Sequence, residues 1–299
     1  MESSRFGASF SVKQCRNLGI DWQACLTWAL DQGWRRFRLM SYWNEIEKQR
    51  GIYDFTELDR QLELIIARGG AVTLCLGVKQ PRWPEYHWPK WARDMAKKER
   101  DAALMTFIEA VVKRYRNLQT IVSWQLENEA LLRGFGERID IDRKRLRREF
   151  DLVKKLDPHR PIIMSTSNSW GLPLRQPVPD IVGFSYYTVI HSHGTYHRTP
   201  HLIWLNRLRA WWLRTVEQRD VFVHELQLEP WGPRAIWEMD MAEQDKSMGP
   251  DQIARNLTAA KRIGAYPIDL WGLEWWYSRA LQGDTTAWSA VHAGISEKS

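Results

Sequence analysis

The sequence predicts one domain, a single (β/α)8 or TIM barrel that spans residues 1–299. Short apolar or β-branched runs alternate with helical patterns along the chain, which is typical of βα units and a parallel sheet. Eight such runs fit into 299 residues, and α/β barrels commonly have about 250. A doubly wound open sheet, the alternative, requires a glycine-rich phosphate loop near its first strand, and the sequence has none there.

The elements follow in order. Strands are expected at 5–10, 37–41, 71–76, 121–126, 161–165, 181–186, 221–225 and 268–272, and helices at 21–32, 55–68, 98–115, 144–156, 203–218 and 250–263. The second of these helices has an apolar face of Leu58, Leu62, Ile65 and Ile66 and ends at a glycine pair, 69–70. Only the segment 168–179 lacks a helical pattern.

Composition excludes several classes of protein. No run of eighteen apolar residues exists, so no integral membrane segment is expected. The net charge of +7 is spread along the chain and is densest at 143–148, on an expected solvated helix, so no nucleic-acid partner is expected. Three cysteines without a CxxC pair indicate reduced thiols. They suit a cytoplasmic location, or an extracytoplasmic one if a leader has been removed; the oligomeric state stays unknown.

Two of the expected strands end in glutamates. The run 121–126 leads into Glu127-Asn128-Glu129, and the run 221–224 leads into Glu225. Barrels carry their functional groups at the carboxyl ends of strands, and a pair of carboxylates there suits acid/base and nucleophilic chemistry on a glycosidic bond. Glu127 is the rival of Glu129, because alternation points both to one side. Glu229, in a proline-containing loop, is the rival of Glu225.

Tryptophan is unusually frequent, at 18 of 299 residues. Several tryptophans lie in expected loops: Trp83, Trp88, Trp91, Trp170 and Trp231. Exposed aromatic faces are costly unless a ligand stacks on them, and sugar rings are natural partners. Packing in the barrel is the competing interpretation for any one of them.

Several motifs together resemble clan A glycoside hydrolases, particularly the bacterial β-galactosidase branch. The second βα unit contains Arg38-Leu39, Tyr42-Trp43, Glu45, Gly51-Ile52-Tyr53-Asp54-Phe55 and Leu58-Asp59. The run 124–129 resembles the fourth-strand motif, whose Asn-Glu carries the acid/base, and 184–188 is similar to the sixth-strand Tyr-Tyr segment of the β-glucosidase branch. Glu225 matches the seventh-strand nucleophile, and 271–276 is similar to the eighth-strand tryptophan region.

The resemblance implies a retaining mechanism without a cofactor or metal. Glu129 would be the acid/base and Glu225 the nucleophile, with their carboxyl groups about 5–5.5 Å apart. The other implied roles are as follows: Arg38 and Tyr187 (rather than Tyr186) hold the nucleophile, Asn128 bonds the sugar 2-hydroxyl, Trp275 floors the subsite with Trp271 and Trp276 as alternatives, and Trp43, Trp83 and Trp231 bind substrate.

The implied function is hydrolysis of a β-linked glycoside or oligosaccharide, so the expected partner is a carbohydrate. A barrel that only binds carbohydrate and a glycosidase that acts mainly as a transglycosylase are the alternatives. The larger β-galactosidases have further domains and often a zinc-binding cysteine cluster, neither of which is found here, so galactose specificity is not carried over. The loops 78–91 and 227–250 are long enough to shape a substrate cleft.

Two further segments have alternative interpretations. His191, His193, His197 and His201 lie in one expected loop, but their wide spacing without a cysteine or acidic neighbour favours a polar loop over a metal site. The stretch 202–214 is basic and amphipathic. Its place as the sixth barrel helix favours packing on the sheet, and a membrane surface is the alternative.

Overall fold

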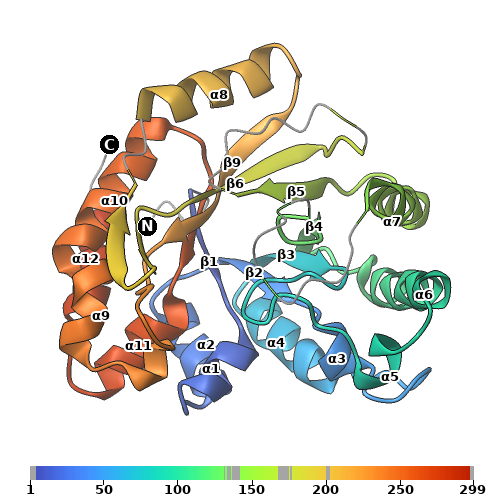
Figure 1. Cartoon of the computed structure of the whole chain (residues 1–299), viewed down its shortest axis with the longest axis horizontal. Helices are drawn as coiled ribbons and strands as arrows, with labels where there is room; N and C mark the ends of the chain where they lie inside the picture. The colour runs from blue at the N-terminus through green and yellow to red at the C-terminus, as the bar shows by residue number, and fades with distance from the viewer. Residues whose placement is uncertain are drawn as a thin grey trace. The chain divides into compact units, whose positions relative to one another are not determined.

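The computed structural model describes residues 5–130, 132, 136, 142–167, 175, 177–199 and 203–296. Eight parallel strands form a closed barrel in the order β1-β10-β9-β6-β5-β4-β3-β2, which confirms the predicted fold class (Figure 1). The chain divides into two compact parts, Met1–Phe37 with Gly183–Ser299, and Arg38–Val182. That all 299 residues form one domain stays a prediction.

Every barrel strand overlaps a predicted one. The strands are β1 Phe6–Ser9, β2 Arg36–Met40, β3 Ala71–Leu76, β4 Ile121–Leu126, β5 Ile162–Thr166, β6 Ile181–Tyr186, β9 Asp220–Gln227 and β10 Ile268–Trp271. Apart from short helices of three to six residues, the helices are α2 Trp22–Asp31, α4 Thr56–Ile66, α6 Lys97–Tyr115, α7 Arg143–Leu156, α8 Ile203–Thr215, α9 Met241–Met248, α10 Pro250–Ile263, α11 Leu273–Leu281 and α12 Thr286–Ser296. The short ones are α1 Val12–Asn17, α3 Trp43–Ile46, α5 Lys90–Arg93 and the 3-10 helix Ile236–Glu238.

Local signals explain where the helices begin and end. The carboxylates of Asp21 and Asp142 cap α2 and α7 by accepting a backbone N–H three residues later. Helix α10 begins at Pro250 and ends at Ile263, and its C-cap is Gly264, whose φ of 73° is left-handed. In α4 the buried face comprises Leu58, Leu62 and Ile65. Ile66 is exposed, so the predicted apolar face was one residue too wide.

A buried charged cluster lies among strands of the first compact part. Asp269 of β10 accepts from Arg36 at 3.0 Å and contacts His224 of β9 at 3.2 Å. Burial raises the pKa of Asp269, but Arg36 and His224 outweigh burial and lower it. The neighbouring strands have glycines beside this cluster because a side chain would collide with it. A Cβ at Gly7 would lie 2.3 Å from the Asp269 carboxylate, and one at Gly183 would lie 2.7 Å from His224.

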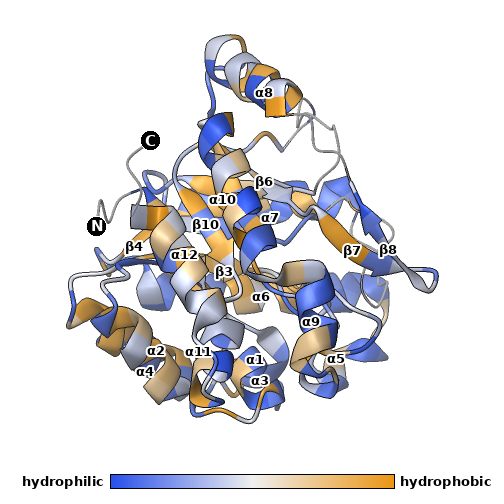
Figure 2. Ribbon diagram, turned by 90° about the vertical axis from the view of Figure 1, so that its left-hand side faces the viewer, coloured by the Kyte–Doolittle hydropathy of each residue, from blue (hydrophilic) through white to orange (hydrophobic). Residues whose placement is uncertain are grey.

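The structure adds elements that the sequence patterns did not predict. The expected loop after β6 contains an antiparallel hairpin, β7 Val189–Ser192 and β8 Thr195–Arg198. Its two-residue turn, His193-Gly194, has positive φ at both positions, as a tight type I′ turn requires. Helices α11 and α12 follow β10. In Figure 2 the hairpin strand β8 has the blue colour of hydrophilic residues. Most of the segment 168–179 lies outside the described residues.

Candidate active site

The chain makes a constrained turn directly after β4. Glu127 and Glu129 have φ of 49° and 44°, in the left-handed region that non-glycine residues rarely adopt. The backbone N–H of Asn128 between them donates to the Lys79 carbonyl at 2.5 Å. The N–H of Glu129 donates to the Ser165 hydroxyl at 2.9 Å. Conformations of this kind cost about 1–3 kcal/mol each and concentrate at functional sites, where the surroundings hold them in place.

Glu127 is held by a structural network. Its carboxylate accepts the backbone N–H groups of Val78 and Lys79 and an Arg145 guanidinium N–H at 3.0 Å. Arg145 also binds Glu149 at 2.8 Å, and all three charged side chains are buried. Burial raises the pKa of Glu127, although Arg145 and the two backbone N–H groups act in the opposite direction.

The prediction that Glu127 and Glu129 point to the same side rested on a pattern that ends before both residues. It assumed the alternation of a continuing strand, but β4 ends at Leu126 and both glutamates have left-handed backbone. Glu127 is buried, whereas Glu129 is partly exposed. The segment that contains Gly77 approaches this turn closely. A Cβ at Gly77 would lie 2.5 Å from Cδ of Glu127.

Asn128 has a fixed amide orientation. Its side-chain oxygen accepts from Arg38 at 2.9 Å and from Ser165 at 3.3 Å. Its Nδ2 donates to the Glu85 carboxylate at 3.1 Å. A cation on the oxygen and an anion on the nitrogen together determine which way the amide faces. Arg38, which is fully buried, also donates from Nε to Gln125 at 2.6 Å.

Lys79 and Ser165 support the turn, and neither was predicted from the sequence. The buried ammonium of Lys79 donates to the Glu129 carbonyl at 3.1 Å and lies 4.0 Å from Glu85. Ser165 contacts both Asn128 and Glu129 from the end of β5. Its place as the last residue of a predicted strand was a signal that could have identified it.

In the other compact part, Glu225 lies on an irregular section of β9. Ile268 of β10 pairs with Val223, but Leu270 pairs with Leu226, so β9 contains one extra residue between these pairs. Such a bulge changes the direction of the local side chains and is common beside active sites. Glu225 is buried, and the Tyr187 hydroxyl donates to its carboxylate at 3.1 Å. Tyr186 is buried within β6, and burial raises its pKa.

Gln227, the last residue of β9, holds the segment that carries Tyr187. Its side-chain oxygen accepts the backbone N–H groups of Thr188 and Val189 at 2.9 and 3.1 Å. Its Nε2 donates to the Val189 carbonyl at 2.6 Å. Asn256 of α10 donates to the Gln227 carbonyl at 2.8 Å, which links this clamp to the helical layer. Sequence reasoning missed Gln227 because a glutamine has no distinctive motif.

The predicted substrate tryptophans have different environments. Trp43 is fully buried and packs against Trp88 and Phe107, and Trp275 lies in α11, only 1% exposed, with Arg279 over its ring. Neither ring has an open face, so burial does not support substrate contact by these two, which stays a prediction. Trp83 is 63% exposed. Trp170 lies outside the described residues.

Two other tryptophans lie near Glu225 in the same compact part. Trp231 packs edge-on against Tyr187, with ring centroids 5.7 Å apart. Trp271, at the end of β10, donates to the Glu229 carboxylate at 2.7 Å. Glu229 is therefore the anchor of a tryptophan side chain. Trp276 is completely buried and donates to the Leu228 carbonyl.

The histidine segment forms the β7–β8 hairpin. His193 and His197 bond to Ser192, and His191 packs against Tyr196, while His201 lies outside the described residues. Within the described ranges, no group of three or more His, Cys, Asp or Glu side chains could hold a metal ion. Tyr196 donates to Glu243 of α9 at 2.7 Å, which fixes the hairpin to the helices.

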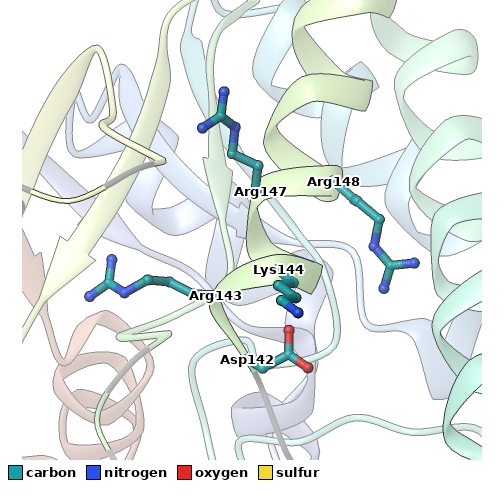
Figure 3. Close-up of a pocket in the computed structure, with 5 residues that line it drawn as sticks. All are labelled: Asp142, Arg143, Lys144, Arg147 and Arg148. Carbon is teal, nitrogen blue, oxygen red and sulfur yellow. The ribbon is translucent and has the colours of Figure 1, made fainter.

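The basic cluster at the start of α7 lines a surface pocket with Asp142. Figure 3 shows that the side chains of Arg143, Arg147 and Arg148 point in different directions. Arg147 pairs with Asp151 at 3.4 Å and Arg148 with Asp101 at 3.0 Å. Guanidinium groups that diverge and bind carboxylates do not form a convergent phosphate site.

Each helix in the described part of the chain is too short or too polar to cross a membrane. Searches of protein-family models and of curated proteins both find no match. Similar solved structures are numerous. The endo-β-1,4-xylanase (glycoside hydrolase family 10) of Gloeophyllum trabeum has a TM-score of 0.65 and 16% identity, over 98% of this chain and 96% of the xylanase.

Two larger enzymes also match. The β-galactosidase of Halorubrum lacusprofundi has a TM-score of 0.58 and 15% identity over 89% of this chain, and the exo-β-1,4-mannosidase of Opitutaceae bacterium strain TAV5 has 0.60 and 18% over 90%. The chain has the fold of these glycoside hydrolases. It spans about half the length of these two, 52% and 51%. At such identities the likeness establishes the fold, and it supports the clan A resemblance at that level.

Proposed function

We propose that this protein is a retaining glycoside hydrolase that cleaves a β-linked glycoside or oligosaccharide. One observation carries the proposal: the Asn128-Glu129 turn follows one strand of a closed parallel barrel, and Glu225 lies near the end of another. Barrel enzymes assemble their active sites from the carboxyl ends of strands. We expect the carboxyl groups of Glu129 and Glu225 to be about 5–5.5 Å apart, the separation that double displacement uses.

The proposed reaction has two steps. A Glu225 oxygen attacks the anomeric carbon while the bond to the leaving oxygen breaks, and Glu129 transfers its proton to that oxygen. Glu129, now ionised, then takes a proton from water as the water oxygen attacks the anomeric carbon and releases Glu225. The Tyr187 hydroxyl orients the Glu225 carboxylate by donating to it. Arg38 is proposed to hold the nucleophile as well.

Asn128 is proposed to bind the 2-hydroxyl of the sugar. One N–H of its amide donates to Glu85, and the other N–H is the one proposed to meet a substrate hydroxyl. Because Arg38 and Ser165 fix the amide oxygen, the donor is preorganised for a contact that strengthens in the transition state.

Carbohydrate is the proposed partner. Trp231, Trp271 and the exposed Trp83 are the aromatic side chains proposed to stack on sugar rings. The similar enzymes are named as a xylanase, a mannosidase and a β-galactosidase, and their names share a β-linkage and no single sugar. The linkage is therefore the part of the substrate that we carry over. A cytoplasmic location, or an extracytoplasmic one after removal of a leader, remains part of the proposal.

The test is turnover of a panel of nitrophenyl β-glycosides with trapping by the matching 2-fluoro glycosides. Peptide mass spectrometry should find the label on Glu225, and Glu129→Gln and Glu225→Gln should each reduce kcat by at least about a hundredfold. Glu238→Gln, at an exposed carboxylate, is the control. Undiminished cleavage by the doubly substituted protein would refute the proposal. Binding without turnover would favour a carbohydrate-binding barrel, and transfer to sugar acceptors in preference to water a transglycosylase.

A further inference from the structure

Helix α8 exposes an apolar stripe on its outer face. Ala210 and Leu213 are buried where α8 packs against α10 and β9 (Figure 1). On the opposite side, Trp204, Leu208 and Trp211 are 61%, 50% and 54% exposed. Their spacing of four and three residues places them on one face of the helix. We call Trp204, Leu208 and Trp211 the α8 stripe.

This arrangement reverses the usual polarity of a barrel helix. A surface helix normally turns its apolar residues inward and its polar residues to solvent. The neighbouring α10 does so, since its exposed positions include Asp251, Arg255 and Arg262. In α8 the buried residues are Arg209, Ala210 and Leu213, and the large indoles lie outside. Trp212 and Val216, 40% and 49% exposed, widen the apolar surface on one side.

The other side of the α8 stripe is positively charged. Arg207 and Arg214 follow each other by seven residues and lie together on that flank. The whole helix, Ile203–Thr215, contains no acidic residue. Arg214 donates to the backbone carbonyls of Val221 and Gly264, so its charge is not neutralised by these contacts. Among the described residues, Arg207 makes no ion pair.

Helices that lie in the plane of a membrane surface typically expose tryptophan and leucine beside arginine. Indole rings favour the boundary between headgroups and acyl chains, and arginines on the flank meet lipid phosphates. A protein partner with an acidic groove would satisfy the arginines but would not by itself account for two indoles of amphipathic character. The net charge of +7 adds a long-range attraction to anionic surfaces.

We infer that α8 docks on the surface of an anionic phospholipid bilayer, with the α8 stripe inserted at the headgroup boundary and Arg207 and Arg214 against the phosphates. This inference is independent of the proposed hydrolase activity, because no residue of α8 belongs to the proposed site. It describes peripheral attachment through one face of one helix.

The test is co-sedimentation of the whole chain with vesicles of phosphatidylcholine containing phosphatidylglycerol, and with vesicles of phosphatidylcholine alone. We expect binding to the anionic vesicles that weakens as salt is added. Trp204→Ser with Trp211→Ser should lower the partition coefficient at least about tenfold. The matched control is Trp237→Ser with Leu281→Ser, since both side chains are exposed elsewhere, at 48% and 60%; it should bind as the parent protein does.

A second variant keeps the test decisive if the tryptophan variant misfolds. Arg207→Gln with Arg214→Gln retains the apolar stripe, and each lost charge should lower partitioning about fivefold. Circular dichroism checks folding, and turnover of a soluble glycoside should be unchanged in both variants. Absence of anionic-vesicle binding by the parent protein would overturn the inference. So would self-association in sedimentation velocity that the stripe variant abolishes while vesicle binding is unaffected, because the face would then bind a second copy.

Discussion

Glu127 and Glu129 show how two identical residues two positions apart acquire different chemistry. Hydrogen-bond donors and the buried Arg145 surround the Glu127 carboxylate, so this side chain has a structural role. Glu129 is held at its backbone by Ser165 and Lys79, and its side chain is partly exposed. The surroundings of each side chain, and not the residue type, make the difference. They are also the reason that Glu129, and not Glu127, is the glutamate proposed for the reaction.

From the buried carboxyl groups of Glu127 and Glu149 we predict that the stability of the protein depends on pH. Burial, and then the neighbouring Glu127, raise the pKa of Glu149 from its ordinary 4.5 to about 8. Between these values the folded protein binds more protons than the unfolded chain, so the free energy of unfolding falls as pH rises from about 5 to 8, with a slope of at most about 1.4 kcal/mol per pH unit.

Substituting Glu149→Gln should remove most of this slope, because the amide does not titrate. Urea unfolding at several pH values measures it, and Glu238→Gln at an exposed position is the control. A slope that is the same in the Glu149→Gln protein would show that Glu149 is ionised at neutral pH in the folded state.

Tyr187 is predicted to act through its hydroxyl. Tyr187→Phe removes the donor to Glu225 and should lower kcat/KM by about 10- to 100-fold, as expected for a hydrogen bond to a charged group. Tyr196→Phe is a matched control, since that hydroxyl also donates to a carboxylate, Glu243, but on the hairpin. Equal losses in the two proteins would mean that the effect is structural.

At the level of elements, the clamp formed by Gln227 joins β9 to the segment after β6. Gln227→Ala removes an acceptor shared by two backbone N–H groups and should destabilise the fold by about 1–3 kcal/mol. Hydrogen exchange of the Thr188 and Val189 amides should accelerate. Gln282→Ala, at the exposed end of α11, should change neither quantity. Unchanged exchange at both amides would contradict the clamp.

The approach of β3 to the turn after β4 predicts a position where only glycine fits. At Gly77 a Cβ would meet Glu127 at 2.5 Å, and φ is 98°, so Gly77→Ala should destabilise the protein by about 2–4 kcal/mol. Gly69→Ala separates the two causes, because φ there is 65° but nothing lies within 4 Å of the added methyl. It should cost about 1 kcal/mol. Similar costs in thermal unfolding would contradict the close contact.

At the scale of the molecule, the barrel was predictable because short apolar or β-branched runs alternate with helical periodicity along the chain. β3, β4 and β6 have the bounds that their patterns predict. The hairpin β7–β8 was not predictable in this way. Its exposed residues have no apolar face, and its turn depends on the left-handed conformations of His193 and Gly194. Periodicity reports burial, and a polar hairpin fixed by side-chain bonds gives no such signal.

The candidate site was predictable in part. Strand ends identified Asn128, Glu129 and Glu225 as residues to consider, because a barrel brings such positions to one edge. Burial of individual tryptophans was not predictable: Trp43 and Trp275 have no local feature that distinguishes them from Trp83 or Trp231. Supporting residues such as Lys79 are selected by contacts between segments far apart in the sequence, which no local pattern contains.

The extra residue in β9 makes the length of that strand as important as its composition. Because side chains alternate along a strand, removing the codon for His224 would leave one residue between Val223 and Leu226 and restore an uninterrupted ladder with Ile268 and Leu270. The sheet would become more regular, and the Glu225 carboxylate would turn to the other face. In descendants of this gene, substitutions should therefore accumulate in β9 far more readily than one-residue gaps.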